Sequence, residues 1–253
     1  MSPPATRSRR PRAEAATADP VARRVAAANW AAIAQALDAR GFATLPGLLT
    51  ASECRALASR YDEDATFRSR VVMQQHGYGQ GEYRYMAYPL PALVERLRRA
   101  LYPRLALVAS AWRRALGQDA ALPPDLDAYL AQCHAAGQTR PTPLLLKYGA
   151  GDYNRLHQDL YGALVFPLQL TVLLSDPAHD FTGGAFLLVE QRPRQQSRAE
   201  AIALRQGEAV IFAVRERPVP GKRGHYRAVM RHGVSTLHSG QRFTLGIIFH
   251  DAK

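Results

Sequence analysis

The residues best suited to chemistry lie between Leu144 and Asp159, a segment that reads Leu-Leu-Leu-Lys-Tyr-Gly-Ala-Gly-Asp-Tyr-Asn-Arg-Leu-His-Gln-Asp. An apolar run, a glycine-bearing turn and a second extended run predict two strands, with His-x-Asp at the end of the second. Side chains two residues apart in a strand point to the same face. His157 and Asp159 therefore present an imidazole and a carboxylate side by side, which is two thirds of a metal-binding face.

A third ligand has to come from further along the chain, where five histidines follow: His179, His225, His232, His238 and His250. We predict that residues 226–232 and 242–248 form an antiparallel hairpin, in which His232 pairs with Arg242. Residues paired across such a hairpin share a face, and Thr244 faces the same way. The hairpin register selects His232 as the third ligand and places a guanidinium and a hydroxyl on the same wall.

Two histidines and one carboxylate form a set that holds Fe(II) and leaves coordination positions open for a chelating cosubstrate and O₂. The guanidinium of Arg242 is a planar fork that suits a carboxylate. A dicarboxylate such as 2-oxoglutarate could bind the metal through its keto-acid end and Arg242 through its other end.

The ordered set resembles the Fe(II)/2-oxoglutarate-dependent dioxygenase superfamily. The matching pieces are Leu-Lys-Tyr-Gly-Ala-Gly, His157-Gln-Asp159, Gly183-Gly184-Ala-Phe, and His232 followed by Arg242-Phe-Thr244. The spacing from His232 to Arg242 is similar to that of prolyl-hydroxylase-like members, whereas the first two pieces together look like AlkB-type demethylases.

Further segments resemble a bacterial group described as oxygenases acting on damaged DNA. They are Phe67-Arg-Ser-Arg-Val-Val-Met73, Tyr83-Arg-Tyr85, Glu190-Gln-Arg-Pro-Arg-Gln-Gln-Ser-Arg198 and Met230-Arg-His-Gly-Val-Ser235. The chain departs from AlkB-type enzymes at one position. Those enzymes carry a second arginine six positions after the cosubstrate arginine, and here that position is Ile248.

The resemblance implies a double-stranded β-helix, a cupin-like jelly roll, with Fe(II) held by His157, Asp159 and His232. It implies that Arg242 binds the distal carboxylate of 2-oxoglutarate, with Tyr148 and Thr244 as hydrogen-bond donors beside it. The implied reaction consumes O₂, releases succinate and CO₂, and hydroxylates a C–H or N-methyl group, with ascorbate as a supporting reductant.

The rest of the chain predicts a mainly β protein with N-terminal helices, of the α+β class. After Arg140, short extended runs alternate with turns and no helix intervenes, which is typical of a barrel or jelly roll; the runs are 143–148, 152–158, 168–175, 184–190, 208–214, 225–231 and 242–249. Four helical segments are predicted before these runs. The first is 20–40, which Gly41 ends, and the second begins after the capping box at Thr50. The third and fourth are 91–116 and 126–136.

We expect three regions. Residues 1–19 are a disordered basic N-terminal tail, residues 20–140 are a helical support region with a lid-like loop at 66–88, and residues 141–253 are the double-stranded β-helix catalytic core. The second and third regions form one integrated domain. The segment 66–88 mixes tyrosines, arginines and glycines, which suits a lid over a pocket and equally an irregular β-hairpin packed on the core.

The net charge of +12 raises nucleic acid or another polyanion as a partner. Only three of the basic residues are lysines, so an arginine-biased genome explains the charge equally well. No apolar run approaches the roughly 20 residues of a membrane span, so we expect no membrane partner. With two widely separated cysteines and no signal-like apolar segment, we expect the cytoplasm. The oligomeric state stays open.

Three functions remain open on the sequence alone. The first is oxidation of nucleic acid, supported by ten Lys/Arg against four Glu between Glu190 and Arg231. The second is hydroxylation of a protein side chain or a small molecule, favoured by the prolyl-hydroxylase spacing and by Ile248. The third is a non-catalytic cupin-type binder. The residues that we expect to contact the substrate are Arg70, Tyr83, Tyr85, Arg192 and Arg194.

Overall fold

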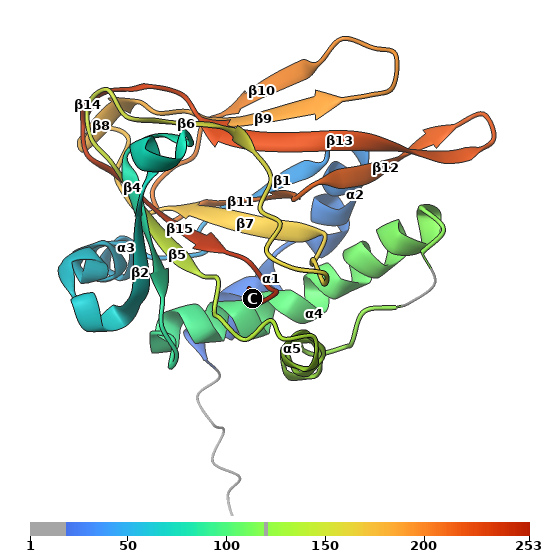
Figure 1. The fold of residues 1–253 in the computed structure, drawn as a ribbon, viewed down its shortest axis with the longest axis horizontal. Helices are drawn as coiled ribbons and strands as arrows, with labels where there is room; N and C mark the ends of the chain where they lie inside the picture. Colours follow the sequence, from blue (N-terminus) through green and yellow to red (C-terminus); the bar gives the residue numbers. More distant parts are fainter. Residues whose placement is uncertain (1–18, 119–120) are drawn as a thin grey trace, which may run out of the picture.

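Two antiparallel sheets stacked face to face make up the centre of the molecule (Figure 1). The computed structural model describes residues 19–118 and 121–253. The larger sheet has seven strands in the order β1-β11-β7-β15-β5-β4-β2, and the smaller has the order β10-β9-β13-β6-β3, with β12 paired to β13. The strands are β1 (Phe42–Leu45), β2 (Phe67–Val72), β3 (Gly79–Gln80), β4 (Glu82–Met86), β5 (Leu144–Tyr148), β6 (Tyr153–His157), β7 (Leu168–Leu173), β8 (Phe181–Gly183), β9 (Phe186–Gln191), β10 (Arg198–Ile202), β11 (Ala209–Ala213), β12 (Glu216–Gly221), β13 (Gly224–Val234), β14 (Leu237–Gly240) and β15 (Arg242–Ile247).

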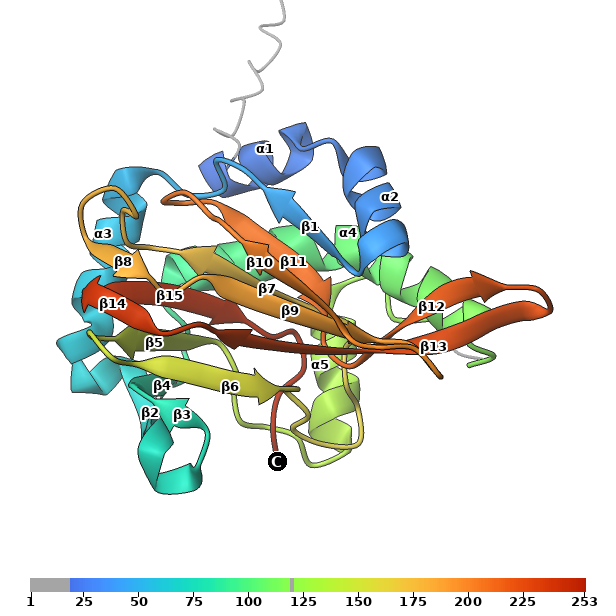
Figure 2. The same cartoon turned by 90° about the horizontal axis from the view of Figure 1, so that it is seen from above.

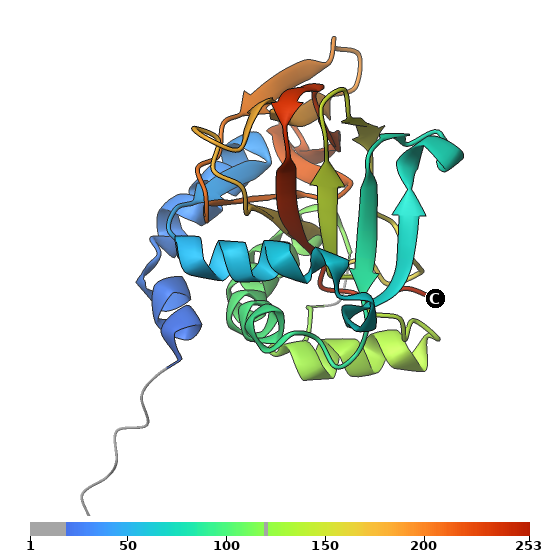
Figure 3. The ribbon, with the colours of Figure 1, turned by 90° about the vertical axis from the view of Figure 1, so that its left-hand side faces the viewer.

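Helices cover the side of the larger sheet that faces away from the smaller sheet (Figures 1 and 2). Among the described residues they are α1 (Pro20–Ala27), α2 (Trp30–Arg40), α3 (Ala51–Ser59), α4 (Ala92–Ala115) and α5 (Leu126–Ala135). Figure 3 shows α3 lying across the strands of the larger sheet, where it contacts β15. Between the sheets, Phe186 of β9 packs on Phe212 of β11 with ring centroids 5.0 Å apart. This is the predicted α+β class with a jelly-roll core. None of the described helices, α4 included, is both long and apolar enough to cross a membrane.

The helix boundaries follow from their capping residues. Gly41 ends α2 in the left-handed conformation at φ 78°, and Thr50 and Glu53 form the predicted capping box at the start of α3. The segment 20–40, predicted as one helix, is two, because the Asn29 side chain accepts the N–H of Ala32 and starts α2 anew. Of the predicted tail, only Asp19 is described, and it caps α1; the rest lies outside the described residues.

The predicted hairpin between 226–232 and 242–248 is wrong. β13 pairs with β6 and β9 in the smaller sheet, whereas β15 pairs with β5 and β7 in the larger one. Between them, β14 pairs with β8 and carries the chain from one sheet to the other. The partner of Arg242 is therefore Tyr148, and the partner of His232 is His157. His232 and Arg242 nevertheless line the same cavity between the sheets.

The segment 66–88 is a β-hairpin. β2 pairs with β4, and β4 extends the larger sheet through β5. A short 3₁₀ helix, η3 (Met73–His76), lies at its tip, and β3 then joins the smaller sheet through β6. The hairpin therefore bridges the two sheets at one edge of the molecule.

A buried ion pair fixes the chain beyond β15 to helix α4. The guanidinium of Arg98 lies 3.0 Å from Asp251 and also donates to the carbonyls of Ile248 and Phe249. Arg98 and Asp251 are both fully buried. Buried charges persist when they are paired and hydrogen-bonded, and here the pair fastens the helical layer to the end of the central strand.

The fully buried His250 in this segment makes the stability of the metal-free protein depend on pH. Its Nδ1 accepts the N–H of Phe166 at 3.2 Å, and burial lowers its pKa to about 4. The unfolded chain then binds the proton more readily, so the free energy of unfolding falls as the pH decreases from about 6.5 towards 4.

We expect His250 to account for a loss of about 2 kcal/mol in the free energy of unfolding between pH 7 and pH 5, measured by urea unfolding. His250→Gln keeps a hydrogen-bond acceptor that does not titrate, so this variant should lack the part of the pH dependence that His250 causes. An identical pH dependence in both proteins would contradict this.

Candidate iron and cosubstrate site

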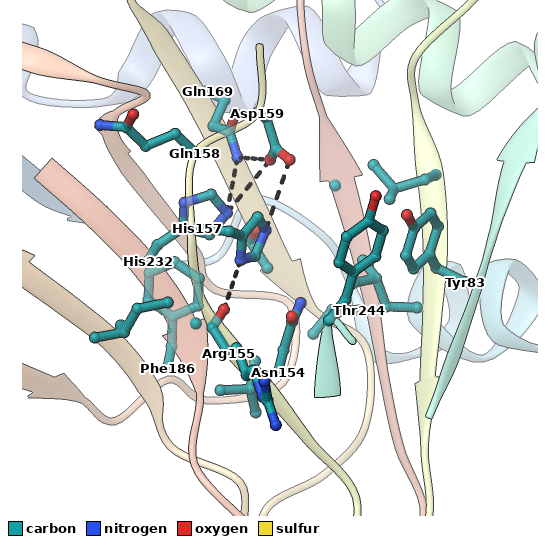
Figure 4. Close-up of a pocket in the computed structure, with 18 of the residues that line it drawn as sticks. Tyr83, Asn154, Arg155, His157, Gln158, Asp159, Gln169, Phe186, His232 and Thr244 are labelled. Carbon is teal, nitrogen blue, oxygen red and sulfur yellow. Dashed lines mark hydrogen bonds and ion pairs between the residues drawn. The ribbon is translucent and has the colours of Figure 1, made fainter. Parts of the chain in front are cut away.

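His157, Asp159 and His232 meet in the smaller sheet (Figure 4). His157 ends β6 and lies directly opposite His232 of β13, and Asp159 follows two residues beyond β6. One ligand atom from each lies within 4.8 Å of the others. The Nε2 atoms of His157 and His232 are 3.6 and 3.3 Å from the Asp159 carboxylate oxygens. Two imidazole nitrogens and a carboxylate oxygen turned to one point are a donor set that fits Fe(II).

Hydrogen bonds reach all three of these side chains, and His232 is contacted by the amide of Gln169, 3.3 Å from its Nε2. The Nδ1–H of His157 donates to the carbonyl of Arg155 at 2.7 Å, which leaves Nε2 free to bind a metal. The hydroxyl of Tyr161 donates to Asp159 Oδ1 at 2.6 Å, and the amide of Gln169 donates to Oδ2 at 2.7 Å. Sequence reasoning missed both Tyr161 and Gln169. The buried strand β7 contains one glutamine and one threonine, and its other residues are apolar. This single glutamine was a signal that could have pointed to Gln169.

The charges of the cluster suit a cation. Burial works to raise the pKa of Asp159, but the hydrogen bond and the nearness of His232, followed by His157 and Tyr161, hold it well below its usual range. Burial, with His157 nearby, lowers the pKa of His232. At neutral pH the carboxylate is therefore ionised and the His232 imidazole neutral, which are the forms that bind a metal ion.

Arg242 faces the same space from the larger sheet. It is 2 % exposed, its Nε and Nη1 have no hydrogen-bond partner, and no acidic residue pairs with it among the ion pairs of the described residues. Burial lowers its pKa to about 10, so it stays charged at neutral pH. A buried charge without a counter-charge is costly. The unpartnered guanidinium therefore fits a ligand carboxylate, as the distal end of 2-oxoglutarate would supply.

Tyr148 and Thr244 line the same cavity as Arg242, and Tyr148 is its partner across the strands. The Arg242 guanidinium carbon is 5.7 Å from the centroid of the Tyr148 ring, and the hydroxyl of Tyr148 accepts a hydrogen bond from Asn154 at 3.4 Å. Burial raises the pKa of Tyr148 to about 12, so its hydroxyl stays protonated and able to donate. Thr244 is also buried and, like Arg242, lines the cavity.

The donor cluster and the Arg242 group open into one cavity of about 570 Å³ between the sheets. Its size is typical of small-molecule sites. Asp159 is the only acidic residue among those that line it. Away from the donors the wall is aromatic and apolar, with Tyr83, Leu144, Tyr161 and Ile248.

The residues expected to contact the substrate are spread more widely. Tyr83 lines the cavity, and Tyr85 stands behind the wall, where its hydroxyl lies 2.8 Å from that of Tyr161. Arg70 is outside the lining and pairs with Glu82. Arg192 pairs with Glu190 at 2.6 Å, and Arg194 lies between β9 and β10 with φ 61°. Neither of these two arginines lines the cavity.

Comparison with known proteins agrees with this geometry. Residues 81–252 match the family Oxygenase-NA, described as an oxygenase catalysing oxidative methylation of damaged DNA. The chain belongs to this family. It is also 57 % identical over 193 residues to an uncharacterized protein of Mycobacterium tuberculosis, a match that covers 74 % of this chain and 83 % of that protein.

A solved structure with a TM-score above 0.5 supports the fold. The α-ketoglutarate-dependent epimerase SnoN from nogalamycin biosynthesis superposes with a TM-score of 0.52 at 19 % identity, covering 87 % of this chain and 81 % of that one. A prolyl-4-hydroxylase from Pseudomonas putida gives a TM-score of 0.48 at 16 % identity, covering 88 % of this chain and all of that one. The chain is therefore a member of an oxygenase family with a jelly-roll fold, and its His157, Asp159 and His232 could hold a metal ion.

Replacing any one of the three donors should prevent metal binding. We expect His157→Ala, Asp159→Ala and His232→Ala each to weaken Fe(II) or Mn(II) affinity by more than about 100-fold, since losing only an outer partner of a metal ligand costs about 10–100-fold. Isothermal titration or equilibrium dialysis measures this. The matched control is His238→Ala, because His238 is exposed on β14. Wild-type affinity in His232→Ala, or its loss in His238→Ala, would contradict the assignment.

Proposed function

We propose that this protein oxidises an alkyl group on alkylated nucleic acid, with Fe(II) held by His157, Asp159 and His232 and 2-oxoglutarate bound through Arg242. The observation that carries the proposal is the buried, unpartnered Arg242 facing the same cavity as the three donors. A charge buried at that place without a counter-ion suits a ligand with two anionic groups, one for Arg242 and one for the metal.

Different residues of the chain have different roles in the proposed reaction. Bound Fe(II), together with 2-oxoglutarate and O₂, supplies the oxidising power for breaking a C–H bond. His157, Asp159 and His232 hold the metal, while Arg242 anchors the distal carboxylate with Tyr148 and Thr244 as neighbouring donors. Tyr161 and Gln169 hold the Asp159 carboxylate in place. The apolar wall excludes water and positions the alkyl group. Hydroxylation of an N-methyl group gives an adduct that releases formaldehyde.

Three observations support nucleic acid as the substrate. The family description names damaged DNA, and the net charge is +12. The aromatic and apolar wall, with no acidic residue besides Asp159, suits a flat base turned out of its stack. Because Cys54 and Cys133 are free thiols, we propose the cytoplasm as the compartment.

Hydroxylation of a protein side chain or a small molecule is the second candidate, and Ile248 favours it. Ile248 is buried and packs with Tyr85 and Leu144, so the wall has an apolar cluster where AlkB-type enzymes carry a second arginine. A cavity of this kind accepts an aliphatic group as readily as a base.

Succinate formation over a panel of substrates tests the proposal. We expect turnover with N-methylated single-stranded DNA or RNA, with formaldehyde and succinate released in equal amounts, and none with unmodified strands. Asp159→Ala is the inactive control. Turnover with peptides or metabolite pools but with none of the alkylated nucleic acids would favour the second candidate instead.

Arg242 should determine the affinity for 2-oxoglutarate. We expect Arg242→Ala to raise the KM for 2-oxoglutarate by about 10- to 100-fold, because hydrogen bonds to a charged group contribute about 1.5–3 kcal/mol each. The KM of Arg242→Lys should lie between those of the wild type and Arg242→Ala, since lysine keeps the positive charge but lacks the planar guanidinium that binds a carboxylate through two hydrogen bonds. The control is Arg205→Ala, which removes an exposed arginine outside the cavity. An unchanged KM in Arg242→Ala would contradict the role.

A further inference from the structure

Two aromatic rings stand exposed at the mouth of the cavity. Tyr78 is 51 % exposed and is part of the cavity lining. The ring of His76 stacks on it, with centroids 5.4 Å apart and planes 23° from parallel. An aromatic ring left in water does not contribute the favourable free energy that it would contribute if it were buried. Together with Leu156 and Leu160, which are also exposed and line the same cavity, the rings form an apolar patch of the kind that marks a binding site.

The position of Tyr78 is fixed relative to the donor cluster. Its carbonyl accepts the N–H of Arg155 at 2.8 Å, and its own N–H donates to Met73 at 3.1 Å. Gly79, at φ 135°, pairs with Asn154 of β6, and a Cβ there would lie 2.2 Å from the Tyr153 carbonyl. Only glycine fits so close an approach. The backbone that carries the ring is thus tied to the strand that ends in His157.

The surroundings of Tyr78 combine a cation with apolar groups. Arg155 is exposed at the mouth and takes part in none of the ion pairs found among the described residues. Leu156 and Leu160 are 44 % and 41 % exposed beside it. A flat ring next to an uncommitted arginine is the combination that binds unpaired nucleotides, whose bases stack while their phosphates pair with the cation. An acidic peptide would use Arg155 but would gain nothing specific from the rings.

We propose that Tyr78 is a stacking site for an unpaired base next to the one that enters the cavity, and that Arg155 binds the backbone phosphate between them. This inference rests on the proposed function, since it requires a nucleic-acid strand at the site. It adds that the substrate is a single-stranded or locally unpaired segment of at least two nucleotides, held at the rim as well as in the cavity.

Binding of a fluorescein-labelled, unmodified single-stranded oligonucleotide tests the stacking site directly. The full-length protein is loaded with Fe(II) and 2-oxoglutarate without O₂, and anisotropy is measured. We expect Tyr78→Ala to weaken binding about fivefold or more, and Tyr78→Phe to bind as the wild type does because it keeps the ring. Retained metal affinity in Tyr78→Ala shows that this variant is folded. Equal binding by wild type and Tyr78→Ala, or no binding by either, overturns the proposal.

The salt dependence tests Arg155. Removing one phosphate contact to a single strand should reduce the slope of log Kd against log salt by about 0.7. We expect this for Arg155→Ala and no change for Arg104→Ala, which removes an exposed arginine of α4. Poly-glutamate that competes as strongly as the oligonucleotide, with the same dependence on Tyr78, would show that a peptide rather than a base occupies the rim and would overturn the proposal.

Turnover separates this inference from the proposed function. We expect Tyr78→Ala to raise the KM of a methylated oligonucleotide severalfold more than the KM of the methylated nucleoside, because the nucleoside has no neighbouring base. If both substrates respond equally, the stacking site is overturned while the proposed function stands. If neither substrate is oxidised by the wild type while oligonucleotide binding still depends on Tyr78, the proposed function fails and the binding surface stands.

Discussion

The register between β6 and β13 is the constraint on which the site depends. It sets His157 opposite His232 in the smaller sheet and brings Asp159, just beyond the strand, within reach of both. A shift of one residue in either strand would turn its histidine to the outer face. The register is in turn fixed on the other side of β13, where Leu188 of β9 pairs with His232. The donors therefore sit at the centre of a sheet that cannot slide without breaking several strand pairings.

The two sheets contribute different parts of the chemistry. The smaller sheet supplies the two imidazoles, and the larger sheet supplies Arg242, Tyr148 and Gln169. Gln169 connects the halves, because it comes from β7 of the larger sheet and donates to Asp159. The distance between the sheets, set by packing such as Phe186 on Phe212, thus determines how far the donors stand from the arginine.

Local patterns in the sequence predicted much of this arrangement. Short extended runs separated by turns located β5, β6, β7, β9, β11, β13 and β15. The two-residue period of a strand predicted that His157 and Asp159 would meet, and capping residues located the end of α2 and the start of α3. The pairing of His232 with Arg242 was wrong, because a chain that changes sheets looks locally like one that turns back. The hydrogen bond of Gln169 to Asp159 joins β7 to the loop after β6, a contact that no single segment reveals. Tyr161 lies only two residues after Asp159, but the spacing alone does not show that its hydroxyl turns back to the carboxylate.

The hairpin of β2 and β4 lies at the edge of the larger sheet, whereas β15 and β5 lie inside it. Changes in an edge hairpin disturb few strand pairings, and loops at such places vary most readily between relatives. The tip of this hairpin carries Tyr78, and the inner strands carry Arg242 and Tyr148. If Tyr78 and Arg242 act as proposed, a substitution at the rim would change which molecule is admitted without disturbing the strands that bind the cosubstrate. Specificity and reactivity would then depend on separate parts of the fold.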